Sequence, residues 1–189
     1  MSDNDIVNKI TGGDKEAYRL IVEKYRQAIF RICMGYAHDE NDANDLTQET
    51  FINAYQNLHK FKFKSAFSTW LYRIAVNLSL NFIRSKKRIL LERYTNTSEA
   101  SLRSLEISTN EVLNPEQIIL NEEQSNIIKK ELHKLSDQQK TAFILSKYDN
   151  MSQKEIAEIM KISEGAVESL IQRAKVNLYK NLATYFKKN

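Results

Sequence analysis

Residues 60–88, KFKFKSAFSTWLYRIAVNLSLNFIRSKKR, carry a clear helical pattern. From Phe67 onward, apolar side chains recur at spacings of three and four residues, which places them along one face of an α-helix. This face is formed by Phe67, Leu71, Ile74, Leu78 and Phe82. The spacing predicts a helix that begins after Ser65 and buries this stripe in a core.

The same stretch combines basic and aromatic side chains and contains no acidic residue. Cations attract phosphates and flat rings stack on bases of any sequence, so this composition is typical of single-stranded nucleic-acid binding. Each good stack contributes on the order of 1–3 kcal/mol. The alternative is that the rings only fill a core. Phe67 and Phe82 belong to the buried stripe, so the rings that remain available for bases are Phe61, Phe63, Tyr72 and Trp70.

The composition of the whole chain favours an all-α fold. Four glycines and one proline are few for 189 residues, whereas sheet-rich proteins need more of both in their turns. This length allows one domain or two small ones. The formal net charge is only +4, so the position of the charges is more informative than their sum.

Several classes of protein are disfavoured by what the sequence lacks. The N-terminal residues are polar and lack the apolar segment that a signal peptide contains. No apolar run approaches the ~18–20 residues of a membrane span. We therefore expect a cytoplasmic protein without membrane insertion. Cys33 has apolar neighbours, which indicates a buried thiol. His38, His59 and His133 do not share a ligand spacing, so no metal or other cofactor is expected.

A second helix, at about residues 40–58, is predicted to present an acidic ridge. No Lys or Arg occurs in residues 32–59, which contain Asp39, Glu40, Asp42, Asp45 and Glu49. The acids at the start of this helix complement the positive end of its dipole. Asp45 and Glu49 lie a turn or more inside it, and with Gln48 they would suit docking to a basic protein surface.

The helical pattern stops beyond Arg88. From Tyr94 to Asn114 the chain is rich in Ser, Thr, Asn and Glu and its leucines show no helical period, which predicts a flexible linker. A solvated tether and a segment that occupies a groove on a partner both fit this composition. Pro115 suits the first turn of a new helix. The predicted organisation is a helical domain at 1–90, a linker at 91–114 and a second helical domain at 115–189.

The second domain carries the pattern of a helix-turn-helix. Ser152 and Glu155 have the spacing of a capping box that begins one short helix, and a tight turn at residues 163–165 precedes the next. The second helix of such a motif typically lies in the major groove, where arginine suits guanine, glutamine suits adenine and glutamate suits cytosine. A plain helical hairpin is the alternative. The side chains predicted to face the groove are Glu164, Ala166, Glu168, Ser169, Gln172, Arg173 and Val176.

Over nearly its full length the chain resembles bacterial RNA polymerase sigma factors of the extracytoplasmic-function (ECF) group. The resemblance is carried, in the order of that family, by GDKEAYRLIVEKY, DANDLTQETFINAYQNL, FSTWLYRIAVNLSLNFIR, NPE, LSDQQKTAFIL and the helix-turn-helix. It implies sigma region 2 in the first domain and sigma region 4 in the second. The function it implies is that of a non-catalytic factor that binds core RNA polymerase, directs it to promoters and promotes melting of the minus-ten element.

The resemblance also implies three binding surfaces. The clamp helices of the largest polymerase subunit would contact Asp45, Leu46, Gln48, Glu49 and Phe51. The minus-ten element would contact Lys62, Phe63, Trp70, Tyr72, Arg73, Asn77, Leu78, Ser79, Asn81, Arg84, Lys87 and Arg88. The minus-thirty-five element would contact Ser152, Glu164, Ala166, Glu168, Ser169, Gln172 and Arg173. The flap of the second-largest subunit would meet the helical surface beside this last set.

One departure qualifies the resemblance. Glu168 and Leu170 stand where many family members carry basic residues, so no promoter sequence is transferred to this chain. Control by an anti-sigma factor is common in the family, although no residue here identifies such a partner.

A free-standing helix-turn-helix transcriptional regulator is the rival interpretation, but it leaves the acidic ridge and the basic aromatic stretch unused. The charge of residues 60–88 also allows a closed form in which the second domain packs on that surface.

Overall fold

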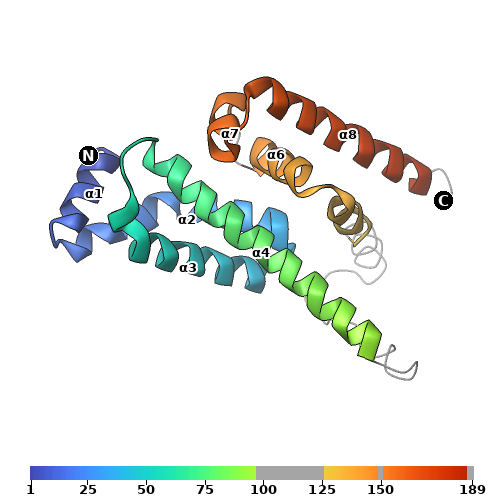
Figure 1. Ribbon diagram of the computed structural model, residues 1–189, viewed down its shortest axis with the longest axis horizontal. Helices are drawn as coiled ribbons and strands as arrows, with labels where there is room; N and C mark the ends of the chain where they lie inside the picture. The colour runs from blue at the N-terminus through green and yellow to red at the C-terminus, as the bar shows by residue number, and fades with distance from the viewer. Residues whose placement is uncertain (97–125, 149–150, 187–189) are drawn as a thin grey trace, which may run out of the picture.

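The computed structural model describes residues 1–96, 126–148 and 151–186 (Figure 1). Within these ranges every regular element is a helix, which confirms the predicted all-α fold. Most of the predicted linker, and the helix start expected at Pro115, lie outside the described residues.

The first domain consists of four α-helices and two single 3₁₀ turns. Its elements are α1 (Asp3–Thr11), η1 (Lys15–Ala17), α2 (Tyr18–Ala37), α3 (Glu40–Asn57), η2 (Leu58–Lys60) and α4 (Phe67–Asn96). Helices α2, α3 and α4 pack on one another around a core that includes Ile29, Ala54 and Leu71, all fully buried. The boundaries of α3 and the start of α4 agree with the helical periods in the sequence.

Helix α1 was not predicted, because its sequence is mostly polar, although Ser2 and Asp5 form a capping box at its start. The Ser2 hydroxyl accepts from the Asp5 backbone N–H, and the Asp5 carboxylate accepts from the Ser2 N–H, so two free donors of the helix start are satisfied. Asp3 then ties the helix to α2, where it bonds Lys24 and the Tyr25 hydroxyl.

Helix α4 is longer than the sequence indicated. The predicted domain boundary lies at residue 90, whereas the helix continues to Asn96. The missing apolar period beyond Arg88 therefore marks the point where the helix leaves the core, not the point where it ends. Exposed Ile89 and Leu91 agree with this explanation.

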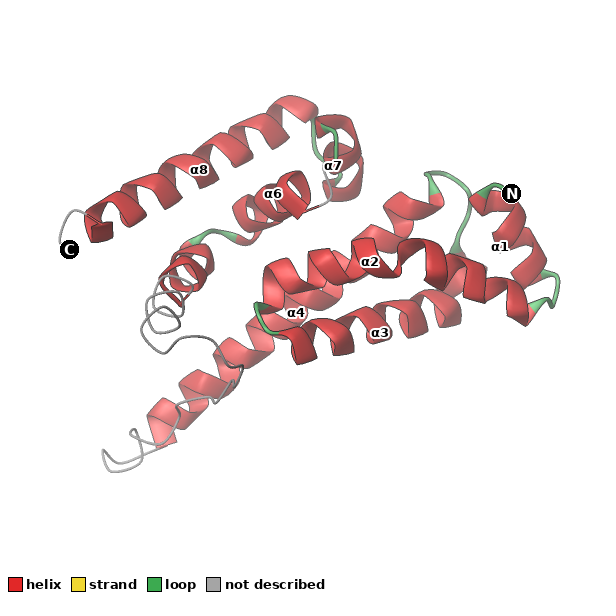
Figure 2. Ribbon diagram, turned by 180° about the vertical axis from the view of Figure 1, so that it is seen from behind, coloured by secondary structure: helices red, strands yellow, loops and turns green. Residues whose placement is uncertain are grey.

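The second domain follows after the residues outside the described ranges. It contains a helical segment at 126–134 and then α6 (Asp137–Tyr148), α7 (Gln153–Met160) and α8 (Glu164–Phe186). Seen from both sides, α6, α7 and α8 lie on one side of the first domain, and α3 lies on the far side of α2 (Figures 1 and 2).

The turn between α7 and α8 differs from the prediction. Helix α7 ends at Met160, and the next residue, Lys161, adopts the left-handed conformation with φ of 56° and lets the chain turn without a glycine. Ser163 then caps α8, since its hydroxyl accepts from the Ala166 N–H. Gly165 lies in the first turn of α8, so the turn occupies residues 161–163 and not 163–165.

Candidate nucleic-acid and protein interfaces

The loop before α4 and the start of α4 form a cluster of four aromatic rings, of which Phe63 is the most exposed. Phe63 has a φ of 55° and is 46% exposed, and its ring lies 4.8 Å from that of Phe61. Phe61 is buried against Phe67 and Trp70, with ring centroids 5.5 and 5.4 Å away. A left-handed φ is costly for a bulky residue, so the surrounding ring cluster must hold Phe63 in this position. Phe61 thus supports the surface, and Phe63 offers its ring to solvent.

The other two predicted rings are half-buried. Trp70 packs on Phe67 with centroids 5.7 Å apart, and Tyr72 meets Tyr25 edge to face at 6.2 Å. Each ring therefore has part of its surface fixed by the core and part open on the outer side of α4. Such rings are rigid, which lowers the entropy lost when a base stacks on them.

The basic side chains of α4 and its loop fall into two groups. Lys62, Lys87 and Arg88 are exposed, and Arg88 pairs with Glu92 one turn along the same helix. Arg73 and Arg84 instead contact the second domain. Arg73 donates to the main-chain carbonyls of α7, and Arg84 donates through Nε and Nη2 to one carboxylate oxygen of α6.

The polar positions predicted along α4 are also divided. Asn77 and Asn81 are exposed, whereas Leu78 packs against the core. Ser79 is fully buried, and its hydroxyl donates to the Sγ of Cys33 at 3.9 Å. Burial raises the pKa of the Cys33 thiol, which is a feature of an interior pair. Ser79 has no surface for a base in this structure, and we leave it out of the proposed contacts.

The acidic face of α3 combines polar and apolar side chains. Asp45, Gln48 and Glu49 are exposed as expected, while Leu46 and Phe51 are only 4% and 7% exposed. The last two residues hold α3 on the core and cannot form a contact surface themselves. Their burial follows from the position of α3, which packs against both α2 and α4 and so buries a wide stripe.

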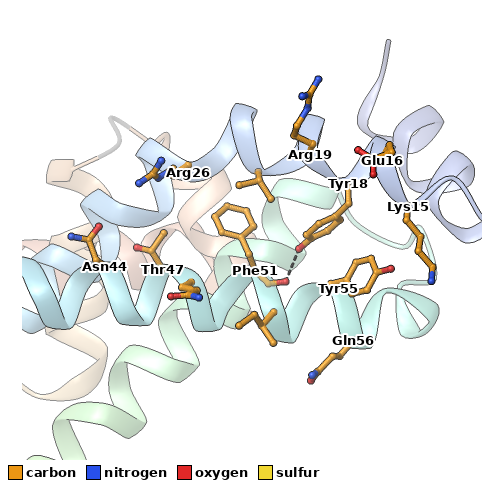
Figure 3. Close-up of a pocket in the computed structure, with 13 residues that line it drawn as sticks. Lys15, Glu16, Tyr18, Arg19, Arg26, Asn44, Thr47, Phe51, Tyr55 and Gln56 are labelled. Carbon is orange, nitrogen blue, oxygen red and sulfur yellow. Dashed lines mark hydrogen bonds between the residues drawn. The ribbon is translucent and has the colours of Figure 1, made fainter.

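Two other apolar residues of α3 are exposed and can form the contact that was predicted for Leu46 and Phe51. Ile52 and Tyr55 are 49% and 40% exposed, and both line a cavity of about 850 Å³ between α2 and α3 (Figure 3). The Tyr18 hydroxyl donates to the Phe51 carbonyl at 2.6 Å, and the Tyr18 ring meets Tyr55 edge to face at 4.9 Å. The sequence contained a signal for this pair, because Gln48, Ile52 and Tyr55 share a helical spacing of four and three.

The helix-turn-helix presents its second helix outward. Glu164, Glu168, Ser169, Gln172 and Arg173 are exposed, and Ala166 is half-buried. Val176 and Tyr179 extend the same face and are strongly exposed. The spacing of these residues places them along one side of α8, as the sequence predicted.

Ser152 lies at the start of α7, where its capping role occupies its polar atoms. The hydroxyl accepts from the Glu155 N–H at 3.3 Å, and the Glu155 carboxylate accepts from the Ser152 N–H at 2.8 Å. The Ser152 hydroxyl also donates to this carboxylate at 2.7 Å, and these two donors lower the pKa of Glu155. Ser152 is exposed, but the Glu155 carboxylate already takes both its N–H and its hydroxyl.

Two classes of site are not found in the described parts of the chain. There, no three His, Cys, Asp or Glu side chains are grouped so that they could hold a metal ion. Among the same residues, no helix is both long and apolar enough to cross a membrane.

Two helical domains, one with a basic aromatic helix and one with an outward helix-turn-helix, define a DNA-binding transcription factor of the sigma type. The sigma-70 region 2 family model matches residues 21–89, and the sigma-70 region 4 model matches residues 125–178. The chain is 35% identical to the ECF RNA polymerase sigma factor SigW of Bacillus subtilis, over 93% of this chain and 94% of that protein. It is 34% identical to the ECF RNA polymerase sigma-E factor of Escherichia coli K12, over 93% and 91% of the two chains.

The chain therefore belongs to the ECF family of RNA polymerase sigma factors. Its fold agrees with that of CnrH, solved in complex with the cytosolic domain of CnrY, with a TM-score of 0.65 and 22% identity over 96% of this chain and 97% of that one. As a sigma factor it binds core RNA polymerase and promoter DNA and acts in transcription initiation. This result favours the sigma interpretation over a free-standing helix-turn-helix regulator.

Proposed function

We propose that three separate surfaces of the protein bind its three targets during transcription initiation. The exposed face of α3 and its cavity bind core polymerase, the α4 face with the loop before it takes the separated strand of the minus-ten element, and α8 reads the minus-thirty-five element. The observation that carries this proposal is that the first domain presents two chemically different surfaces on different helices. One is acidic and apolar, and the other is basic and aromatic.

The polymerase surface combines apolar and acidic side chains of α3. Ile52 and Tyr55 line the cavity and provide apolar area, while Asp45 and Glu49 lie outside the cavity lining and provide negative charge. The opposite side of the cavity is basic, since Lys15, Arg19 and Arg26 line it. Interfaces commonly have an apolar centre that supplies affinity and charges that steer association. This combination fits the clamp helices of the largest subunit if those helices present basic and apolar side chains.

The nucleic-acid surfaces differ in the form of DNA that they suit. Exposed Phe63 and half-buried Trp70 and Tyr72 can stack on unpaired bases, with Lys62 and Lys87 beside the phosphates. Arg173 and Gln172 on α8 carry donors suited to base edges in the major groove. The protein would then act as a binding subunit without catalysis of its own, in the cytoplasm and without a resident cofactor.

The proposal also includes the predicted domain limits at residues 90 and 115. It further includes a contact of the second domain with the polymerase flap and binding of an anti-sigma factor. The solved relative RpoE of Bartonella quintana is described in complex with the anti-sigma factor NepR, and it shares the fold of this chain at 21% identity with a TM-score of 0.60.

The function is tested by mixing the chain with core polymerase that lacks any sigma factor and measuring run-off transcription from promoters of its own genome. The Asp45→Lys variant should weaken binding to core polymerase about a hundredfold, because a like charge facing a basic surface costs several kcal/mol. Glu158→Lys makes the same charge change on α7 and serves as the matched control. Equal binding of Asp45→Lys and the control would move the docking face away from α3.

A further inference from the structure

Helix α1 belongs to none of the three proposed binding surfaces, yet it is firmly attached to the first domain. It lies outside residues 21–89, which match the sigma-70 region 2 model. The Asp3 carboxylate accepts hydrogen bonds from the Tyr25 hydroxyl and from Lys24 Nζ, both on α2. The apolar side of α1 is buried in the core and consists of Ile6, Val7 and Ile10. Any contribution of α1 to initiation must therefore act through its neighbours.

Tyr25 connects α1 to the start of α4. It is 7% exposed, and its ring centroid lies 6.1 Å from that of Phe67 and 6.2 Å, edge to face, from that of Tyr72. Ser68, in the first turn of α4, also hydrogen-bonds the Tyr25 side chain. Burial and the bond to Asp3 raise the pKa of Tyr25, so the phenol stays protonated and remains a donor at neutral pH.

Tyr25 lies at the inner end of a continuous array of aromatic rings. Phe67 contacts Phe61 and Trp70 with centroids 5.5 and 5.7 Å away, and Phe61 contacts Phe63 at 4.8 Å. Tyr25 thus touches each ring proposed to take the minus-ten strand directly or through one or two others. Because packed interiors transmit small displacements, a shift of the Tyr25 ring would move the whole array.

The loop that carries Phe63 depends on this packing. Phe63 keeps a left-handed backbone with φ of 55°, which a bulky residue holds only where its surroundings fix it. Helix α1 lies beside this loop in both views, and it contacts η2, from which the loop begins (Figures 1 and 2). Helix α1 and the start of α4 therefore both bound the loop.

The bond between Asp3 and Tyr25 is well placed to fix the Tyr25 ring. It holds the far end of the side chain, so the ring cannot tilt without breaking it. The Asp3 side chain is only 19% exposed, and hydrogen bonds to an ionised acceptor are about twice as strong as neutral ones. Lys24 pairs with the same carboxylate and lies over the Tyr25 ring, with Nζ 5.0 Å from the centroid.

We propose that Asp3, acting through Tyr25, is a positioning residue for strand capture: it holds the ring array in the place where it accepts unpaired bases. This inference rests on the proposed role of the α4 rings at the minus-ten element. Neither Asp3 nor Tyr25 lines the cavity between α2 and α3. Their loss should therefore reduce strand opening and leave polymerase docking unchanged.

A double-mutant cycle in the polymerase complex tests this coupling. Asp3→Ala removes the acceptor, and Tyr25→Phe removes the donor but keeps the ring. Each full-length variant should lower the equilibrium constant for strand opening, measured by permanganate reactivity of unpaired thymines, about threefold to tenfold, because one charge-assisted hydrogen bond is lost. The double variant should lose no more than either single variant, since each change already breaks the bond. Binding to core polymerase should stay within about twofold in all three.

Asp3→Asn is the matched control, because its amide oxygen can still accept from Tyr25 although the charge is gone. It should retain strand opening within about twofold. Glu23→Ala removes an exposed carboxylate of α2 that pairs with Arg19, and it should leave strand opening unchanged.

Three results would overturn the proposal. Unchanged opening in Asp3→Ala would show that the bond is not needed, and additive losses in the double variant would show that the two residues act independently. Equal losses in Asp3→Ala and Asp3→Asn would assign the effect to charge. Trp70→Ala in the same assay keeps the two ideas apart. If it also left opening unchanged, the proposed role of the rings would fail, whereas a loss with Trp70→Ala alone would reject only the role of Asp3.

Discussion

The α4 face and the α8 face are both proposed to bind DNA, yet the structure presents them in opposite states. On α4, two of the predicted cations are bound by the other domain, and Asn77 lines a cavity that is shared with α6 and α7. On α8, Gln172 and Arg173 are exposed to solvent. The surface suited to duplex DNA is thus presented directly, and the surface suited to single strands is covered at Arg73 and Arg84 while Phe63 stays exposed. A single strand exists only after polymerase has acted, so covering its binding site beforehand does not delay the search for a promoter.

What lies over the two faces explains the difference, because the packing behind them is shared. The second half of α8 rests on a small cluster within its own domain, formed by Leu132, Leu135, Ala174 and Leu178. Its first half belongs, like α6 and α7, to the large cluster of the first domain, through buried Val167 and half-buried Ile171. The two faces therefore differ in that contacts from α6 and α7 occupy the arginines of α4, whereas Gln172 and Arg173 on α8 are exposed.

The largest effect should come from breaking this shared core. Ile156 in α7 is fully buried in it, so Ile156→Ala should lower the free energy of unfolding by about 2–5 kcal/mol. Trp70, the one tryptophan, lies in the first domain and reports that domain by its fluorescence. Urea unfolding followed at Trp70 should shift to lower urea, although the substitution lies in the second domain.

Val176→Ala provides the matched control, because Val176 is 61% exposed on the outer face of α8. We expect its effect to stay within about 0.5 kcal/mol. If Ile156→Ala left the Trp70 transition unchanged while circular dichroism showed loss of helix elsewhere, the two domains would be independent and the contrast between the faces would lose its basis.

The next effect concerns strand capture on α4. Trp70→Ala removes a ring that packs on Phe67, and it should cost the open promoter complex about 1–3 kcal/mol of stacking. Permanganate reactivity of unpaired thymines in the polymerase complex measures this loss. Tyr179→Ala removes an exposed ring from α8 outside the predicted contacts and should leave strand opening unchanged. Equal reactivity in the two variants would remove Trp70 from the minus-ten surface.

A smaller effect is expected on the exposed α8 face. Arg173→Ala should weaken upstream promoter binding by about 1–2 kcal/mol, roughly five- to thirtyfold, because one side chain that contacts a base or phosphate is lost. A footprint of the polymerase complex over the minus-thirty-five element measures the change. Lys175→Ala, a neighbouring exposed cation, is the control for charge. If both variants weakened the footprint equally, Arg173 would contribute only through its charge.

Much of the helical framework could be predicted from the sequence because it is local. The period of α4, the acidic start of α3 and the capping box at Ser152 all depend on residues three or four apart. Helix α1 escaped prediction although Ser2 and Asp5 form a local capping box, because its apolar side chains Ile6, Val7 and Ile10 are few among polar residues. The end of α4 was also missed, since a helix that leaves the core loses its apolar period.

The chemical character of the surfaces could be predicted better than their exposure. Composition identified the acidic and basic stretches, but burial of Phe51 and Ser79 depends on packing against other helices. The partners of Arg73 and Arg84 lie 53 to 86 residues away, beyond any local pattern. The general idea of a closed form was available from charge alone. The charge did not identify the partners, which are the Asp137 carboxylate and the main-chain carbonyls of Glu158 and Ile159.

The smallest predicted effect is an acid sensitivity at the edge of the domain contact. His38 ends α2 in the left-handed conformation, and its ring lies 5.8 Å from that of His133 in the second domain. Burial, with smaller contributions from His133 and from the positive side chains of Lys129 and Lys140, lowers the pKa of His38 to about 4 from its usual 6.5. The unfolded chain therefore binds more protons than the folded one between these values, and stability falls as the pH drops through this window.

This loss should amount to about 1 kcal/mol between pH 7.5 and pH 5, a modest value because the imidazole is only partly buried. Urea unfolding at the two pH values measures it, and His38→Asn, which also tolerates the left-handed backbone, should remove most of it. The remainder belongs to His133, since burial lowers the pKa of that imidazole as well. His59→Asn, on the exposed 3₁₀ turn η2, should retain the full acid sensitivity and controls for the carboxylates that titrate in the same range. If the His38→Asn and His59→Asn variants lost stability equally on acidification, the sensitivity would arise outside the domain contact, and the closed α4 face would be held by apolar burial and its arginine contacts alone.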